Sequence, residues 1–164
     1  MKLAIGILLV IIATLVLWLT VEITTNGQQR KHIQELTSQV ADKSRRENLE
    51  FQQMCALQVE KVFRAIGWKE GVPQDGNIAT YQSHYNPKLG KCFMTLDITG
   101  MNTTRTLFDA YEQRDYAVYL WMPRKDKKFW EVPPTICRLI PSSGSEQICK
   151  SEEEYKEFVA HYME

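Results

Sequence analysis

The sequence predicts an α+β protein: an N-terminal transmembrane helix and a helical stalk, then an antiparallel β meander flanked by an N-terminal and a C-terminal helix. Three observations predict this class. Residues 3–21 carry no charge, residues 77–149 show period-two alternation interrupted by turn residues, and helical apolar spacing lies on both sides of that region. Helices segregated from an antiparallel sheet are typical of α+β domains.

The first element is a run of 19 uncharged residues from Leu3 to Val21, bounded by Lys2 and Glu22. As a helix it would measure roughly 28 Å, which matches the hydrocarbon core of a bilayer. Trp18 lies near its far end, where aromatic side chains favour the membrane interface. Two alternatives are a cleaved signal peptide and a helix buried in a soluble protein. The run exceeds a signal-peptide core and no small-residue cleavage site follows it, so we predict an uncleaved anchor.

A polar helical stalk is predicted to follow the anchor, over residues 22–48. Residues 24–27 form a short polar break at its start. Beyond this break, Ile33, Leu36 and Val40 make an apolar stripe with coiled-coil spacing, which is too short to predict a partner helix.

The globular domain is predicted to cover residues 49–164, which follows an anchor over 1–21 and the stalk. Its first helix has one apolar face, and Gly67 after that face is a typical helix stop. The apolar face consists of Cys55, Val59, Val62, Phe63 and Ile66.

A first β-hairpin is predicted from residues 77–85 and 91–99. If Tyr85 paired with Lys91, the apolar residues of the second strand would lie beside polar residues of the first strand. A one-residue bulge at Gly90 places them beside a more apolar face instead, and glycine tolerates the positive φ that a bulge needs. We favour the bulged register, because a one-residue slip exchanges the two faces. The apolar face then holds Ala79, Tyr81, Ser83 and Tyr85 with Cys92, Met94, Leu96 and Ile98.

Further strands complete the predicted meander, and a capped helix ends the chain. An alternative for residues 107–111 is a helical turn. The terminal helix opens with a capping box, in which Ser151 and Glu154 satisfy each other's backbone N–H groups. The further strands are residues 104–112, 116–122, 135–140 and 147–149, with turns at 113–115 and around Ser143.

The four cysteines are Cys55, Cys92, Cys137 and Cys149, and none forms a C-x-x-C pair. An even number without metal-binding spacing predicts disulfides. Cys137 and Cys149 lie opposite each other across the last predicted hairpin, and a bridge there would stabilise the domain by roughly 3 kcal/mol. By elimination Cys55 joins Cys92; the alternative is two buried free thiols.

The location of the domain follows from these cysteines. Lys2 before the apolar run, and Arg30 with Lys31 after it, leave the orientation undecided by the positive-inside rule. Disulfides form in oxidising compartments. We therefore expect a single-pass membrane protein whose C-terminal domain is extracytoplasmic, either periplasmic or at the cell surface.

Composition and motifs exclude several function classes. Outside Lys2, 19 basic and 20 acidic residues remain, without the basic excess of a nucleic-acid binder. The histidines, His32, His84 and His161, have no metal-ligand spacing, and no phosphate-binding or nucleophile motif occurs. We therefore predict no nucleic-acid partner, no metal and no cofactor, and nominate no catalytic residue. A thiol nucleophile made of Cys92 and His84 is disfavoured, because the two side chains fall on opposite faces of the favoured hairpin.

Polar and aromatic residues gather at one end of the first predicted hairpin. Tyr81, His84, Tyr85 and Lys88 are the candidate binding residues there, and the alternative is ordinary strand-end chemistry. The expected partners are the lipid bilayer, through residues 3–21, and an envelope protein or glycan.

Three segments resemble a pattern in small exported or membrane-anchored bacterial proteins of an uncharacterised family. They are Tyr81 to Cys92 (YQSHYNPKLGKC), Thr103 to Leu107 (TTRTL) and Cys149 to Glu152 (CKSE). The resemblance covers roughly residues 50–164. It implies a bacterial origin and a periplasmic or surface setting, and no activity is attached to it.

The order of elements is also similar to that of type IV pilins and pseudopilins. Those proteins have a leader cleaved after glycine and a glutamate at the fifth mature position, whereas Gly6 is followed by Ile7 to Ile11 without a glutamate. We therefore predict a non-catalytic, membrane-tethered envelope protein with a disulfide-stabilised binding or structural module. The alternatives are a pilin-like filament subunit and an enzyme whose site the sequence does not reveal.

Overall fold

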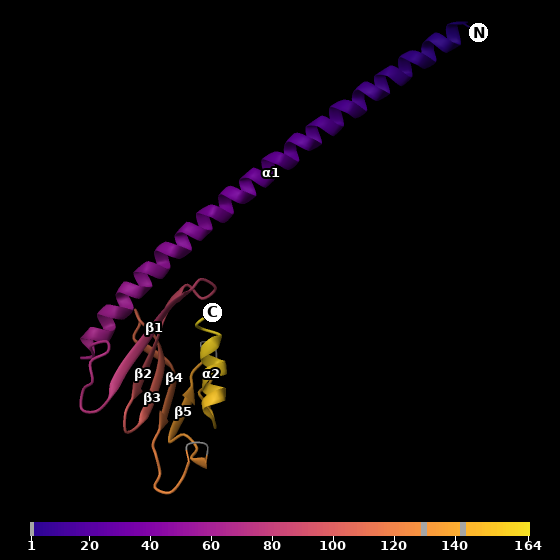
Figure 1. Ribbon diagram of the computed structural model, residues 1–164. Coiled ribbons are helices and arrows are strands. Elements are labelled where there is room, and N and C mark those ends of the chain that lie inside the picture. The colour runs from indigo at the N-terminus through magenta and orange to yellow at the C-terminus, as the bar shows by residue number, and fades with distance from the viewer. Residues whose placement is uncertain (1, 129–130, 142–143) are drawn as a thin grey trace. The chain divides into compact units, whose positions relative to one another are not determined.

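The computed structural model describes the backbone of residues 2–128, 131–141 and 144–164, with the side chains of Trp18 and of residues from 28 onward in those ranges. The chain divides into two compact units, Met1–Glu47 and Asn48–Glu164. Within the described ranges, two helices and six strands confirm the predicted α+β class. The elements are α1 (Lys2–Ala65), β1 (Ile78–Asn86), β2 (Lys91–Thr99), β3 (Thr103–Asp109), β4 (Arg114–Trp121), β5 (Ile136–Leu139), β6 (Gln147–Ile148) and α2 (Glu152–Ala160) (Figure 1).

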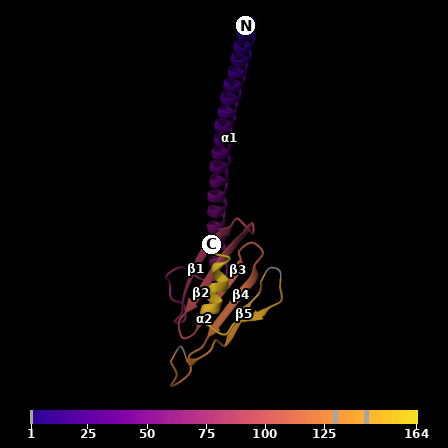
Figure 2. The ribbon, with the colours of Figure 1, turned by 90° about the vertical axis from the view of Figure 1, so that its right-hand side faces the viewer.

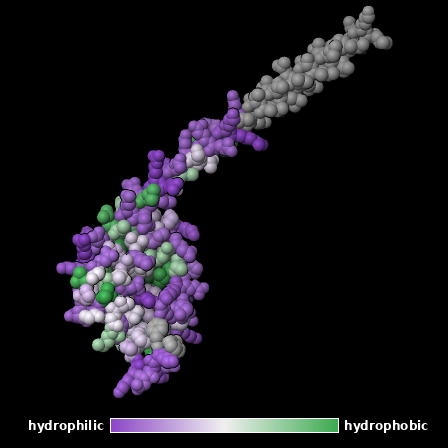
Figure 3. Space-filling view, viewed as in Figure 1, coloured by the Kyte–Doolittle hydropathy of each residue, from purple (hydrophilic) through white to green (hydrophobic). Residues whose placement is uncertain are grey.

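The backbone of α1 is helical through residues 24–27, so the predicted break there is wrong. An isolated glycine costs a helix only about 1 kcal/mol, which does not end it. Ile33, Leu36 and Val40 are exposed, and residues 28–47 are mainly hydrophilic (Figure 3). The predicted anchor, residues 3–21, lies outside the described side chains except for Trp18. Within the described part of the chain, no helix combines the length and apolar character that crossing a membrane requires.

One antiparallel sheet organises the second unit, with its strands in the order β1-β2-β3-β4-β5-β6. In the first hairpin Tyr85 pairs with Cys92 and Asn86 with Lys91, which confirms the favoured assignment of faces. The predicted bulge is replaced by a four-residue loop, in which Gly90 has a φ of +63°. Asn86 is buried and its Oδ1 atom accepts two backbone hydrogen bonds from this loop, which explains why a loop is preferred to a bulge.

The turn between β3 and β4 covers residues 110–113, so the predicted turn at 113–115 is wrong. The cause is Asp109, whose Oδ1 atom accepts hydrogen bonds from the backbone N–H groups of Tyr111 (2.9 Å) and Glu112 (3.0 Å). An aspartate that binds the N–H two residues ahead initiates a turn at its own position. The chain is a strand up to this aspartate, so the alternative of a helical turn is also wrong.

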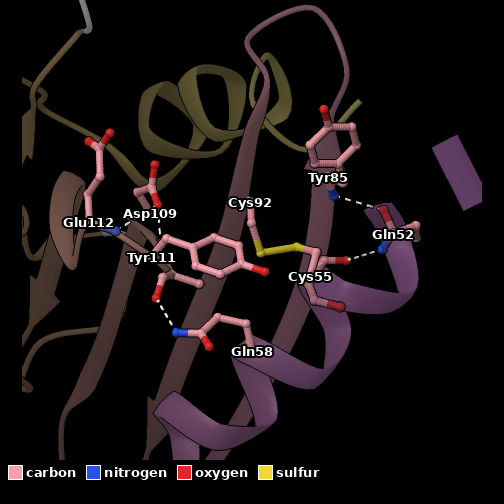
Figure 4. The surroundings of a disulfide bond; sticks show 10 residues. Gln52, Cys55, Gln58, Tyr85, Cys92, Asp109, Tyr111 and Glu112 are labelled. Carbon is pink, nitrogen blue, oxygen red and sulfur yellow. Dashed lines mark hydrogen bonds between the residues drawn. A yellow bond between two sulfur atoms is a disulfide. The ribbon is translucent and has the colours of Figure 1, made fainter. Parts of the chain in front are cut away.

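The last turns of α1 pack against one face of the sheet. Four of the five predicted apolar residues of this helix are buried, whereas Ile66 is 48% exposed because the helix ends at Ala65. The sulfur atoms of Cys55 and Cys92 form the predicted disulfide in this core, with their Cα atoms 5.4 Å apart (Figure 4). The core residues are Cys55, Val59, Val62, Phe63, Ala79, Cys92, Met94, Leu96, Phe108 and Ala110.

Two glutamines of α1, on either side of this disulfide, bind backbone groups of β1 and of the turn between β3 and β4 (Figure 4). Gln52 accepts a hydrogen bond from the N–H of Tyr85 (2.7 Å) and donates one to the carbonyl of Ser83 (3.3 Å). Gln58 donates to the carbonyl of Ala110 (3.0 Å). Because β1 is an edge strand, its outward backbone groups lack a strand partner. The amide of Gln52 binds two of them as a neighbouring peptide would.

The opposite face of the sheet is covered by α2 (Figure 2). Ser151 is its N-cap, and the Ser151 hydroxyl accepts a hydrogen bond from the N–H of Glu154 (3.2 Å), as predicted. The carboxylate of Glu154 reaches the N–H of Lys150 (2.8 Å) instead of that of the cap residue. The core under α2 consists of Phe93, Leu107, Tyr116, Tyr119, Cys137, Leu139, Cys149, Tyr155 and Tyr162.

The second predicted disulfide lies in this core. Cys137 and Cys149 are bonded with their Cα atoms 5.0 Å apart, and the N–H of Cys149 donates to the carbonyl of Cys137 (3.0 Å). The neighbouring pair, Arg138 and Ile148, continues the same register. The predicted opposition of the two cysteines across the hairpin is therefore confirmed.

A charge network holds the start of α2 to the sheet. The guanidinium of Arg105 on β3 contacts Asp97 Oδ1 on β2 (3.0 Å) and the carboxylate of Glu152 on α2. Lys156 Nζ lies 2.5 Å from Glu152 Oε1, and the guanidinium of Arg105 also stacks over the ring of Tyr119. Arg105 therefore balances two acidic groups that come from different elements.

The network makes stability depend on pH. Burial opposes ionisation of Glu152, but hydrogen bonds from Arg105 and Lys156 outweigh it and hold the pKa of this carboxyl below its usual value. Such a group stabilises the fold above its unfolded-state pKa and loses that contribution as the pH falls through its folded-state pKa. The carboxyl of Asp97 has the opposite effect on the pH dependence of stability. Burial raises its pKa despite the neighbouring Arg105, so its ionisation lowers the stability of the fold as the pH rises.

We expect Glu152→Gln to lower the free energy of unfolding at neutral pH. The variant should also lose less stability than the wild type between roughly pH 5 and pH 3, because it lacks the carboxylate that is protonated there. Urea unfolding of the full chain in detergent micelles, followed by near-ultraviolet circular dichroism at stepped pH, measures both effects. Parallel pH profiles for the two proteins would contradict this assignment.

Candidate functional site

The structure does not bring the four predicted binding residues together. Tyr81 and Tyr85 lie on the face that α1 covers, where the ring of Tyr85 stacks on Phe51 with centroids 4.9 Å apart. His84 lies on the opposite face, and Lys88 is exposed in the loop between β1 and β2. Of these residues, Tyr81 lines the candidate site below.

His84 and Cys92 do not form a thiol–imidazole pair. Cys92 is held in a disulfide, and its partner across the hairpin is Tyr85. His84 pairs with Phe93, which faces α2. The Nε2 atom of His84 is buried and has no hydrogen-bond partner among the described residues.

A cavity of about 590 Å³ lies between the end of α1, the loop that follows it and β1. This volume is in the range of small-molecule sites. We call it the aromatic cavity, because three of its lining residues are aromatic. Its lining residues are Glu60, Phe63, Arg64, Gly67, Trp68, Lys69, Glu70 and Tyr81.

The end of α1 shapes this cavity. Gly67 has a φ of +93°, a conformation that favours glycine, and its N–H donates to the carbonyl of Arg64 (3.0 Å). The N–H of Trp68 donates to the carbonyl of Phe63 (3.3 Å), and Gln74 Nε2 donates to the carbonyl of Gly67 (3.0 Å). The predicted stop at Gly67 is confirmed, and the turn carries Trp68 back toward β1.

The aromatic wall is supported from below by the core. Phe63 is 1% exposed, and its ring centroid lies 4.5 Å from that of Tyr81. Trp68 is half-buried and packs against the same core. Among the described residues, neither the hydroxyl of Tyr81 nor the indole N–H of Trp68 has a hydrogen-bond partner. The wall therefore offers apolar ring surface together with two unused donors.

The charged residues of the cavity balance each other. Glu60 and Arg64 form an ion pair on successive turns of α1. Lys69 and Glu70 have no ion-pair partner within the described ranges. Partial burial and the nearby carboxylates of Glu70 and Glu60 raise the pKa of Tyr81, so its hydroxyl stays protonated at neutral pH. The cavity thus combines both signs of charge and has no net charge.

A second groove, of about 420 Å³, lies between β1, β2 and the last turns of α2. The hydroxyl of Tyr155 is buried beside it without a hydrogen-bond partner among the described residues. Its charged residues, Asp97, Arg105 and Lys156, all belong to the network that holds α2. Because these groups already serve the fold, the aromatic cavity is the stronger candidate.

Trp68, Lys69 and Glu70 are not among the binding residues that the sequence predicts. The available signal was a tryptophan directly after a glycine helix stop, followed by two charged residues. Nothing local to this segment indicates that it lies beside Tyr81, because the contact depends on how α1 packs against β1. In the described part of the chain, no group of three or more histidine, cysteine, aspartate or glutamate residues is arranged to hold a metal ion.

Comparison with family models, with curated protein sequences and with solved structures finds no match to this chain. The resemblances to exported bacterial proteins and to pilins therefore stay predictions.

Proposed function

We propose that this protein is a membrane-tethered envelope protein whose extracytoplasmic domain has a binding role and no catalytic one. An anchor over residues 1–21 and a stalk over 22–48 precede that domain. The observation that carries the proposal is the pair of disulfides, which use all four cysteines. Structural disulfides persist in oxidising compartments and are rare in the cytosol. The 19-residue uncharged run supports the proposed tether.

The proposed binding role is supported by the aromatic cavity. It combines ring surface with hydrogen-bond donors and a carboxylate that have no partner among the described residues, a mixture that is typical of ligand sites. Its lining lacks a nucleophile paired with a base, the arrangement that covalent catalysis requires.

Alkylation of isolated membranes tests the membrane location and the disulfides together. We expect the native chain to resist carbonate extraction and to react with maleimide only after reduction. Mass mapping without reductant should then recover peptides that link Cys55 to Cys92 and Cys137 to Cys149. Release by carbonate, with all four thiols reactive before reduction, would contradict the proposal.

A matched variant tests the tether. Ile11→Lys with Val16→Lys places two charges within the uncharged run, at a cost of roughly 3 kcal/mol each in a bilayer. We expect this variant to leave the membrane fraction. A control protein with lysine at Ile33 and Val40, in the exposed stalk, should remain in the membrane fraction.

A pilin-like filament subunit is the second candidate, favoured by one observation. The backbone of α1 is helical from Lys2 to Ala65, without the interruption that the sequence predicts. The missing glutamate after Gly6 counts against this candidate. Mass spectrometry of the mature N-terminus distinguishes the two, because only a pilin-like subunit would begin at Ile7.

A further inference from the structure

We propose that the aromatic cavity binds a neutral saccharide, with one sugar ring lying against Trp68 and Tyr81. This inference rests on the proposed binding role and names its ligand class. The cavity brings aromatic surface together with hydrogen-bond donors and acceptors that have no partner among the described residues.

The chemistry of the two exposed-edge aromatic residues, Trp68 and Tyr81, suits a sugar ring. A pyranose has a flat apolar face of C–H groups and a rim of hydroxyls. Trp68 and Tyr81 present the complementary surface, because each ring has an apolar face and a polar N–H or O–H at its edge. Phe63 beneath Tyr81 is 1% exposed, so it contributes to the wall mainly by packing against the ring of Tyr81.

The free polar groups match hydroxyls. A sugar hydroxyl both donates and accepts a hydrogen bond, so it needs acceptors and donors close together. Glu70 is a free acceptor, whereas Lys69 and the hydroxyl of Tyr81 are free donors among the described residues. A ligand that lacked hydroxyls would leave these groups without partners when it displaced their water, which costs affinity.

The charge balance disfavours ionic ligands. A quaternary ammonium would find aromatic surface, but Arg64 and Lys69 line the same cavity and would repel it. An anion such as phosphate would meet Glu60 and Glu70. A neutral polyhydroxylated ligand avoids both penalties.

The cavity is also preorganised. Gln74 holds the carbonyl of Gly67, and the N–H of Trp68 is bonded to α1 (3.0 and 3.3 Å). A ligand therefore does not have to order this turn when it binds, which lowers the entropic cost of association.

Calorimetric titration of the full chain tests the proposal. The chain is kept in micelles of a polyoxyethylene detergent, because sugar-based detergents would compete. The probes are chitotetraose and maltotetraose, and the comparison ligands are choline chloride and inorganic phosphate. We expect heat of binding with at least one oligosaccharide and none with the two ions. Binding of either ion in preference to both saccharides would overturn the proposal, as would binding of no probe at all.

Variants locate the binding. Glu70→Gln keeps the shape of the side chain and removes its charge, and Tyr81→Phe keeps the ring and removes the hydroxyl. Each should weaken saccharide binding about tenfold, because Tyr81→Phe loses one hydrogen bond and Glu70→Gln replaces a charge-assisted hydrogen bond with a weaker neutral one. Glu157→Gln, at an exposed position of α2, is the matched control and should bind as the wild type does.

A spectroscopic readout separates the site from a folding defect. In a chain labelled with 5-fluorotryptophan, the fluorine NMR resonance of Trp68 is assigned as the one that Trp68→Phe removes. We expect the saccharide to shift this resonance. A shift confined to other resonances, or full binding by Glu70→Gln and Tyr81→Phe, would overturn the site. The test does not depend on cell location, so failure of the membrane experiment and failure of this one are distinguishable.

Discussion

Replacement of Cys55 and Cys92 together by alanine is expected to lower the free energy of unfolding by about 4 kcal/mol. The two residues are 37 positions apart, so their bond closes a long loop in the unfolded chain and lowers the conformational entropy of the unfolded state. Both side chains are almost fully buried between α1 and β2, and alanine leaves part of their volume empty as well. Urea unfolding of the full chain without reductant measures the loss.

The second disulfide provides the matched control. Cys137 and Cys149 are 12 positions apart, and the same relation predicts about 3 kcal/mol for their joint replacement by alanine. The order of the two losses is the test, because both pairs are buried and both changes remove the same atoms. A greater loss from the shorter loop would contradict the entropic explanation. Removal of both disulfides should abolish most of the free energy of unfolding of a domain of this size.

Arg105→Met is expected to destabilise the domain by about 3 kcal/mol. The guanidinium of Arg105 lies between Asp97 and Glu152, and methionine would leave these two partly buried carboxylates facing each other without it. Lys156 still contacts Glu152, which keeps the loss moderate. Chemical unfolding at neutral pH measures the effect.

Arg138→Met is the control for this change. Arg138 lies 3.7 Å from Glu146 and both side chains are about half exposed (47% and 48%), so the pair should contribute less than about 1 kcal/mol. Equal losses from the two arginine variants would show that Arg105 has no special role. Adding Asp97→Asn to Arg105→Met should recover part of the stability, because burial already disfavours the charge on Asp97.

The disulfide and the charge network each attach one helix to the sheet. The Cys55–Cys92 bond fixes α1 on one face, and the network around Arg105 fixes α2 on the other. The aromatic cavity lies where α1 ends, close to the first of these attachments. A loss of the Cys55–Cys92 bond should therefore also weaken saccharide binding, whereas Arg105→Met should affect stability alone.

The sequence by itself determined the features that depend on local periodicity. Strand β2 occupies the predicted residues, because its side chains alternate between two faces that differ in polarity. Both cysteine pairs follow from position: Cys137 and Cys149 are opposed across a short hairpin, and the other two were left to pair with each other. The cap at Ser151 is equally local, because its partner is three residues away.

Tertiary structure alone decided the rest. The turn after β3 begins earlier than its sequence indicates, because Asp109 is buried and binds Lys91 from a neighbouring strand as well as the turn itself. The aromatic cavity joins Trp68 to Tyr81 across a loop, and the network joins Arg105 to Glu152 across 47 positions. Contacts between residues so far apart depend on the packing of whole elements, and no periodicity or spacing along the chain records them.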